Sequence, residues 1–223
     1  CRDYAVASSK RKILLALRQI DCNTVSTLKE RVLHDKSMFM QLLQYLTIPV
    51  SEMFRDPGHF LALRQEVVPL LHTWPSIKVW IAGCSTGEEV YSMAILLREE
   101  GLLERTIIYA TDINPRSLEK AKQGIYSMQS MREYAENYWL AGGRRDFAEY
   151  YTAAYGNAIM DSTLREQVTF ADHSLATASA FSEPHLVPCR PVLIYFATPL
   201  HARPLALFPA SFCHPGLLVL ART

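Results

Sequence analysis

Hydrophobic residues recur at helical spacing in the first third of the chain, and strand-like and helical segments alternate after it. Three short amphipathic helices are predicted between residues 5 and 46, and a fourth follows Asp56. Asp56 is the expected N-cap of that fourth helix, and Pro57 occupies its first position. We therefore expect an all-helical N-terminal domain and its connector over residues 1–73, followed by a second domain over residues 74–223.

The predicted N-terminal helices are amphipathic and locally basic. The first should bury the face that carries Ile13, Leu14, Leu17 and Ile20, and Asn23 or Thr24 can cap the second. The basic excess comes from Lys10, Arg11, Lys12, Arg18, Lys29 and Arg31. Two interpretations stay open for these residues, a solvated helix surface or a docking face for an acidic partner.

The second domain is organised around a strand, a glycine turn and a helix. Ile77–Ala82 is a short apolar run typical of a strand buried on both faces. Gly83 and Gly87 bracket a polar turn, and helical spacing begins again at Val90. Doubly wound sheets open nucleotide pockets in this way, because glycines let the backbone approach a ligand and the amides at the helix start favour polar groups.

A second predicted strand, Ile107–Thr111, ends directly before Asp112. An acidic residue at this point of a doubly wound sheet can accept hydrogen bonds from both ribose hydroxyls of an adenosine. The glycine spacing is G-x-x-x-G and differs from the dinucleotide pattern G-x-G-x-x-G, so NAD is not the leading ligand. We predict an adenosine-binding pocket over Gly83, Gly87 and Asp112.

The remaining pattern completes an α/β domain. A helix is predicted over Met128–Leu140, a small antiparallel β insert over about 143–165, and a third parallel strand over Gln167–Ala171. Leu186–Phe196 has the apolar content of a central strand, but it contains prolines, which cannot donate to a ladder and are normally excluded from central strands. The expected fold is a doubly wound, Rossmann-like domain preceded by helices.

Composition narrows the function classes. The chain is 49% hydrophobic and 20% charged with a net charge of +1, which is ordinary for a soluble domain and gives no global case for nucleic acid. No apolar run is long enough to insert into a membrane and no signal segment opens the chain, so we expect a cytoplasmic protein. Five cysteines without a C-x-x-C pair favour neither a disulfide framework nor a metal site.

Several blocks in one order resemble the CheR family, S-adenosylmethionine-dependent methyltransferases that esterify receptor glutamates in bacterial chemosensory signalling. The resemblance extends from about Leu46 to Leu220. Its blocks are M-F-R-D-P-G-H-F (53–60), W-I-A-G-C-S-T-G-E-E-V-Y-S (80–92), A-T-D-I-N (110–114), L-E-K-A-K-Q-G-I-Y (118–126) and C-R-P-V-L-I-Y-F (189–196). It implies S-adenosylmethionine as cofactor, S-adenosylhomocysteine as product, and a chemoreceptor or receptor-like protein as partner.

Carried over position by position, the resemblance implies a set of site residues. The cofactor pocket would include Ser51, Arg55, Glu89, Asp112, Ser174, Leu175, Cys189 and Arg190. Arg55 and Tyr195 would lie near the methyl group and the incoming carboxylate, as catalytic residues. From the residues alone, the Arg55 guanidinium can fork onto a carboxylate or pair with Asp56.

The chain departs from the family pattern at several positions. The family usually has Asn at the positions of Pro49, Ser174 and Pro191, and an acidic residue near His185. The family pattern also continues into G-H-S-E and a final strand pair, so we expect the C-terminal strands to be truncated. Three hypotheses therefore stay open: a protein-glutamate methyltransferase, a degenerate non-catalytic relative that binds S-adenosylmethionine, its product or a signalling partner, and a small-molecule methyltransferase.

Overall fold

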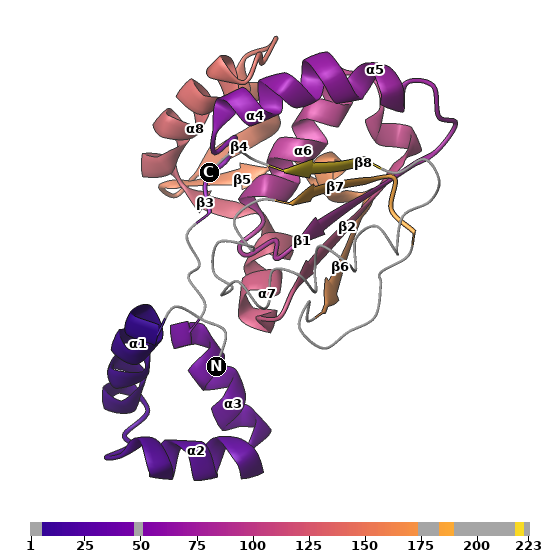
Figure 1. Ribbon diagram of the computed structural model, residues 1–223. Helices are drawn as coiled ribbons and strands as arrows, with labels where there is room; N and C mark the ends of the chain where they lie inside the picture. The colour runs from indigo at the N-terminus through magenta and orange to yellow at the C-terminus, as the bar shows by residue number, and fades with distance from the viewer. Residues whose placement is uncertain (1–5, 47–50, 174–182, 190–216, 221–223) are drawn as a thin grey trace.

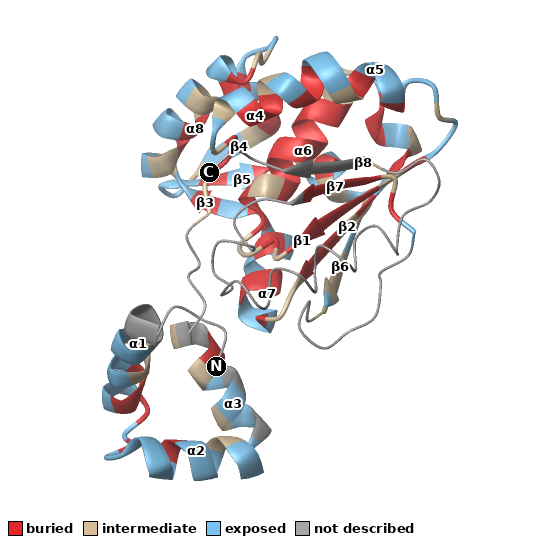
Figure 2. Cartoon of the chain, in the orientation of Figure 1, coloured by how far each residue is buried: buried red, intermediate tan, exposed pale blue. Residues whose placement is uncertain are grey.

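The structure is a computed structural model that describes residues 6–46, 51–173, 183–189 and 217–220 of the chain (Figure 1). Its first three helices are α1 (Val6–Gln19), α2 (Val25–His34) and α3 (Lys36–Leu46). They share a small core of Ala16, Leu17, Ile20, Cys22 and Leu28. Figure 2 shows that most of their remaining surface is exposed. None of the described helices is long and apolar enough to cross a membrane.

Two local predictions for these helices have different outcomes. Thr24 is the N-cap of α2, because its hydroxyl oxygen accepts a hydrogen bond of 3.1 Å from the Thr27 amide. Leu14 was expected on the buried face, but it is 50% exposed, and Ala16 lies fully buried in the small core. The expected basic residues are exposed or half-buried, which agrees with both interpretations of them: Lys10, Arg11, Lys12, Arg18, Lys29 and Arg31.

The predicted fourth helix consists of three pieces. They are α4 (Pro57–Ala62), the π-helix η1 (Leu63–Val67) and α5 (Val68–Leu71). The wide π turn precedes Pro69, which has no N–H to donate to the helix. Asp56 is the N-cap of α4 as predicted, although its φ is 57° and its side chain makes no capping hydrogen bond.

Helices α4 and α5 belong by packing to the second core. Phe60, Leu63 and Leu71 lie buried in the same cluster as β1 and α6, whereas the sequence placed residues up to 73 with the N-terminal helices. Packing therefore changes from one core to the other between Tyr45, which packs against the N-terminal core, and Met53. The division of the chain into two domains stays a prediction.

A parallel sheet forms the centre of the second unit. Its order is β6-β2-β1-β7-β8, and every neighbouring pair is parallel. The strands are β1 (Ile77–Ala82), β2 (Thr106–Asp112), β6 (Val168–Asp172), β7 (Leu186–Cys189) and β8 (Leu217–Leu220). Helix α6 (Glu88–Glu99) and the short 3-10 helix η2 (Leu103–Arg105) connect β1 to β2, and helix α7 (Pro115–Gln123) follows β2. This is the predicted Rossmann-like arrangement of parallel strands and helices.

Strand β7 corrects the expectation about proline. Pro188 is buried within this strand and lies opposite Val219 of β8. The pairing of β7 with β1 is confined to Val79 and Leu186, upstream of the proline. The ladder on the β1 side therefore ends before the residue that lacks an N–H, which lets proline stand inside this sheet. Pro191, also expected within a strand, lies outside the described residues.

The antiparallel unit is larger than the sequence predicted. Its order is β3-β5-β4, with β3 (Ile125–Ser127), β4 (Tyr151–Ala154) and β5 (Asn157–Met160). Strand β3 comes from before helix α8 (Met128–Leu140), outside the expected range of 143–165. Two 3-10 helices, η3 (Phe147–Tyr150) and η4 (Ser162–Arg165), flank the hairpin. The small sheet therefore brackets α8 in sequence.

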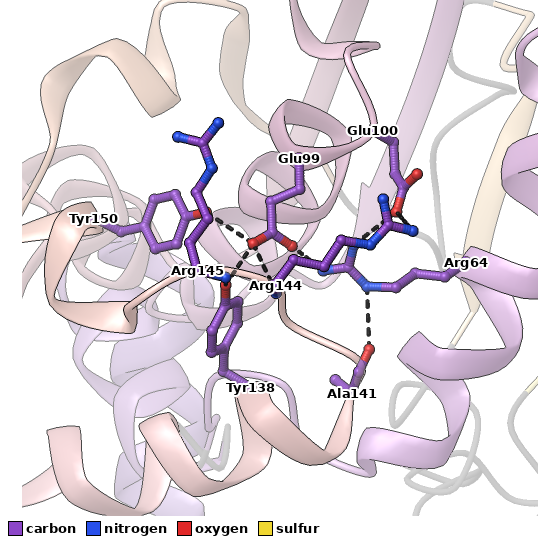
Figure 3. A network of polar contacts seen from close by, with 8 residues as sticks. All are labelled: Arg64, Glu99, Glu100, Tyr138, Ala141, Arg144, Arg145 and Tyr150. Atoms are coloured by element: carbon purple, nitrogen blue, oxygen red, sulfur yellow. Dashed lines mark hydrogen bonds and ion pairs between the residues drawn. The ribbon is translucent and has the colours of Figure 1, made fainter.

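A buried polar cluster joins four of these elements (Figure 3). The guanidinium of Arg64 on η1 pairs with Glu99 and Glu100 at the end of α6, and its Nε donates to the Ala141 carbonyl at 3.1 Å. The hydroxyls of Tyr138 and Tyr150 also donate to Glu99. The side chains of Arg64 and Glu99 are only 4% and 1% exposed. We call these residues the Glu99 cluster.

The Glu99 cluster keeps its carboxylate charged. Burial by itself raises the pKa of Glu99, but the hydrogen bond from Tyr138 and the charge of Arg64 act in the opposite direction, and the net pKa is below its ordinary value. Removing one partner of a buried ion pair leaves the other charge uncompensated. The protein then loses much more stability than the intact pair contributes to it.

We predict that Arg64→Ala lowers the free energy of unfolding by about 3–5 kcal/mol, because it leaves a buried carboxylate uncompensated. Urea denaturation measures this change. Arg132→Ala is the control, since Arg132 is 90% exposed and pairs with Glu136 on the surface of α8, and its loss should cost no more than about 1 kcal/mol. Equal losses in the two variants would contradict a structural role for the Glu99 cluster.

Candidate functional site

The turn after β1 is built against the end of β2. The amides of Gly83 and Cys84 both donate to the Thr111 carbonyl, at 2.7 and 2.9 Å. Positive φ angles occur at Gly83 (71°), Ser85 (51°) and Gly87 (94°). Three such residues within five positions curl the backbone tightly at the carboxyl edge of the sheet, where open α/β sheets bind ligands. We call residues 83–87 the glycine turn.

Gly87 is required for a second reason besides its φ. A Cβ atom on Gly87 would lie 2.7 Å from the Cβ of Ala121 and 2.9 Å from its Cα. Helices α6 and α7 therefore approach each other here more closely than any side chain on Gly87 permits. The sequence predicted a glycine turn for ligand approach, and the structure adds close helix packing at its last residue.

Asp112 fixes the glycine turn from the neighbouring strand. Its carboxylate accepts a hydrogen bond of 2.8 Å from the Ser85 amide and another of 2.8 Å from the Asn114 amide. Burial raises the pKa of Asp112, and the nearby Asp172, its register partner on β6, raises it further against the effect of the backbone hydrogen bonds. Backbone groups therefore hold this carboxylate beside the turn, and its binding of a ribose stays a prediction.

Glu88 is a buried acid beside the glycine turn that was not expected from the sequence. It is the first residue of α6, is buried, and accepts hydrogen bonds from the Thr86 hydroxyl at 2.7 and 2.9 Å. A hydrogen bond from Ser51 also reaches this carboxyl, whose pKa is raised by burial. The sequence did contain a signal for this contact, because Thr86 stands two residues before Glu88 at the expected start of a helix. Only the neighbouring Glu89 was predicted as a site residue.

The connector that carries Arg55 is anchored on two helices. The Phe54 amide donates to Ser92 Oγ on α6 at 2.8 Å, and the Asn137 side chain on α8 donates to the Met53 carbonyl at 3.3 Å. Phe54 is fully buried in edge contact with Phe60 and Tyr138, at ring distances of 5.1 and 5.3 Å. The backbone of Arg55 therefore lies between an anchored residue, Phe54, and the N-cap residue of α4, Asp56.

Cys84 lies inside the glycine turn as a buried thiol. Burial raises its pKa well above the ordinary value, and the charges of Asp112 and Glu89 add to this effect. A thiol in such surroundings stays protonated, so it is a poor nucleophile and a poor metal ligand.

Trp80 on β1 contacts a residue near the end of β2 and the residue that follows β6. Its indole N–H donates to Thr111 Oγ1 at 2.9 Å, and its ring meets the His173 ring edge-on.

The structure places several of the predicted site residues on segments that meet at the glycine turn and the start of α6. Ser51, Arg55 and Glu89 lie on segments joined to the start of α6, and Asp112 binds the glycine turn directly. Cys189 is described only as the last residue of β7. Four expected residues lie outside the described part of the chain: Ser174, Leu175, Arg190 and Tyr195. The meeting of Arg55 and Tyr195 over a methyl group stays a prediction.

Comparison with known proteins points to one family. The family model described as the SAM-binding domain of CheR methyltransferases matches residues 49–223. A Pseudomonas putida protein, provisionally named methyltransferase Cher3, is 81% identical over 98% of this chain and 80% of its own length. A Listeria monocytogenes chemotaxis protein methyltransferase is 28% identical over 96% and 80%. Chemotaxis protein methyltransferase 2 of Pseudomonas aeruginosa is 31% identical over 77% of this chain and 61% of its own length.

We predict that Gly87→Ala destabilises the chain more than Gly101→Ala. Both glycines have positive φ, 94° and 67°, so alanine should cost about 1–2 kcal/mol at either position. Only Gly87 meets Ala121, and that overlap should add about 1–3 kcal/mol. A Cβ on Gly101 would have no neighbouring atom within 4 Å, which makes this glycine the matched control. Urea denaturation giving equal losses would show that α6 and α7 can separate without cost.

Proposed function

Because the chain belongs to the CheR methyltransferase family, we propose that it transfers a methyl group to glutamate side chains of a chemoreceptor or receptor-like signalling protein. Its cofactor is S-adenosylmethionine, the ligand named for the family domain that matches residues 49–223. The names of the Listeria and Pseudomonas aeruginosa relatives support chemotaxis as the setting. The observation that carries the proposal is the carboxylate of Asp112, held between two backbone amides beside the glycine turn.

The described residues fit this cofactor. Its ribose offers two hydroxyl donors, and Asp112 offers a carboxylate at the carboxyl edge of the sheet, where such ligands bind. Its amino acid part carries a positive ammonium and a negative carboxylate. Around the start of α6, Arg55 provides a positive group, and Glu88 and Glu89 provide acidic groups. Gly83 and Gly87 permit close approach of the backbone. We assign ribose binding to Asp112 and the charged end of the cofactor to the start of α6.

The proposed reaction asks little acid–base chemistry of the protein. The bound sulfonium supplies an electrophilic methyl group. An ionised glutamate is already a nucleophile, so the protein has mainly to align the carboxylate and keep it ionised. Arg55 can do both, since a guanidinium is always charged and can fork onto a carboxylate. Tyr195 would orient the same groups through its hydroxyl.

We predict that Asp112→Asn weakens binding of S-adenosylhomocysteine by about 1–3 kcal/mol, because a buried hydrogen-bonding partner of the ribose is lost. Isothermal titration calorimetry measures the affinity, and thermal unfolding checks that the variant is folded. Glu119→Gln changes an exposed acid on α7 and should bind like the wild type. Wild-type affinity in Asp112→Asn would rule out the ribose assignment.

We also predict that Arg55→Ala reduces the turnover of glutamate methylation far more than it reduces cofactor affinity. The measurement is methyl transfer from labelled S-adenosylmethionine to a glutamate-bearing receptor fragment, with Arg132→Ala as the exposed arginine control. Unchanged turnover in Arg55→Ala would contradict its catalytic role. A wild-type chain that binds S-adenosylhomocysteine and methylates no glutamate would instead support the degenerate, non-catalytic relative.

A further inference from the structure

The small antiparallel sheet contributes a side chain to the glycine turn. Tyr126 is the middle residue of β3, paired with Ala158 of β5. Its neighbours Ile125 and Ser127 are exposed, whereas Tyr126 is 8% exposed and faces the opposite way, as alternation along a strand requires. Its hydroxyl donates a hydrogen bond of 2.9 Å to the Thr86 carbonyl. A residue 40 positions away in sequence therefore binds the backbone of the turn.

This hydrogen bond completes a set of three anchors on the turn. Asp112 holds the Ser85 amide, Glu88 holds the Thr86 hydroxyl, and Tyr126 holds the Thr86 carbonyl. The turn needs such support, because Ser85 is a non-glycine residue with a φ of 51°. Backbone in this region persists only where the surrounding structure determines it more than once.

Tyr126 is itself held firmly. Its ring meets the Tyr91 ring edge-on at 5.8 Å, and the Tyr91 hydroxyl donates to the Ala121 carbonyl at 3.0 Å. The chain turns into β3 at Gly124, where a Cβ would lie 2.3 Å from the Tyr91 hydroxyl. Burial also raises the pKa of Tyr126 well above its ordinary value, so the phenol remains a hydrogen-bond donor.

We propose that Tyr126 is a positioning residue for S-adenosylmethionine, which fixes the glycine turn through the Thr86 carbonyl and couples the small sheet to cofactor binding. The proposal rests on the proposed function, in that the cofactor lies over this turn. Tyr126 would touch no reacting atom. Its hydroxyl holds the backbone between Ser85 and Gly87 in the conformation that receives the cofactor, so that less ordering is left for the ligand to impose.

The test compares Tyr126→Phe with Tyr91→Phe. Each variant keeps its ring and loses one hydrogen bond to a carbonyl, and Tyr91→Phe also loses a hydrogen bond with Arg165, so Tyr91→Phe should lose at least as much thermal stability as Tyr126→Phe. Only Tyr126→Phe releases the glycine turn. We expect its affinity for S-adenosylhomocysteine, measured by calorimetry, to fall about five- to tenfold, the effect of one net hydrogen bond, and that of Tyr91→Phe to change less than about twofold.

Hydrogen exchange of the chain without cofactor gives a second readout. Amides of residues 83–88 should exchange faster in Tyr126→Phe and at the wild-type rate in Tyr91→Phe. If Tyr126→Phe binds S-adenosylhomocysteine like the wild type, the role of Tyr126 is wrong while the proposed function stands. If the wild type does not bind it at all, the proposed function fails and the cofactor role of Tyr126 fails with it. Equal losses of affinity for S-adenosylhomocysteine in Tyr126→Phe and Tyr91→Phe would show that Tyr126 contributes only ordinary packing.

Discussion

The carboxylate of Asp112, shared between the amides of Ser85 and Asn114, is the interaction on which the arrangement of the site depends. It ties the turn after β1 to the turn after β2, so two crossovers of the parallel sheet meet at one side chain. The glycine turn keeps its positive φ angles because this carboxylate, the Thr111 carbonyl and Tyr126 hold it at separate points. The same carboxylate remains at the edge of the sheet where a ribose would bind.

Helix α6 connects the glycine turn at its start to the Glu99 cluster at its end. At its start, Glu88 and Ser92 hold the glycine turn and the connector with Arg55. At its end, Glu99 gathers Arg64, Tyr138 and Tyr150 from three other elements. A nearly continuous run of buried residues joins the two ends, so the helix is packed against its surroundings along almost its whole length. The connector, the small sheet and the glycine turn are therefore positioned relative to one rigid element.

Sequence patterns predicted the features that local physics determines. The strand Ile77–Ala82 and the helix Met128–Leu140 have the predicted bounds, because the hydrophobic pattern lies within each segment and a glycine or proline lies near each of its ends. Asp112 was found for the same reason, as the end of a strand. The contacts of Tyr126 with Thr86 and of Arg64 with Glu99 span 40 and 35 residues, and no local pattern encodes them. The buried proline in β7 depends likewise on where its ladder with β1 ends.

The π-helix η1 sets how α4 is rotated about the helix axis relative to α5. A regular α-helix advances by about 100° for each residue, and a π turn accommodates one extra residue without extending the helix by a full step. Because the π turn absorbs the surplus residue, Phe60 before it and Leu71 after it both face the same core. If the same residues formed a regular α-helix, Phe60 would be turned by about 100° relative to Leu71, and one of the two would leave that core. One surplus residue thus lets both ends of this helix bury their apolar side chains together.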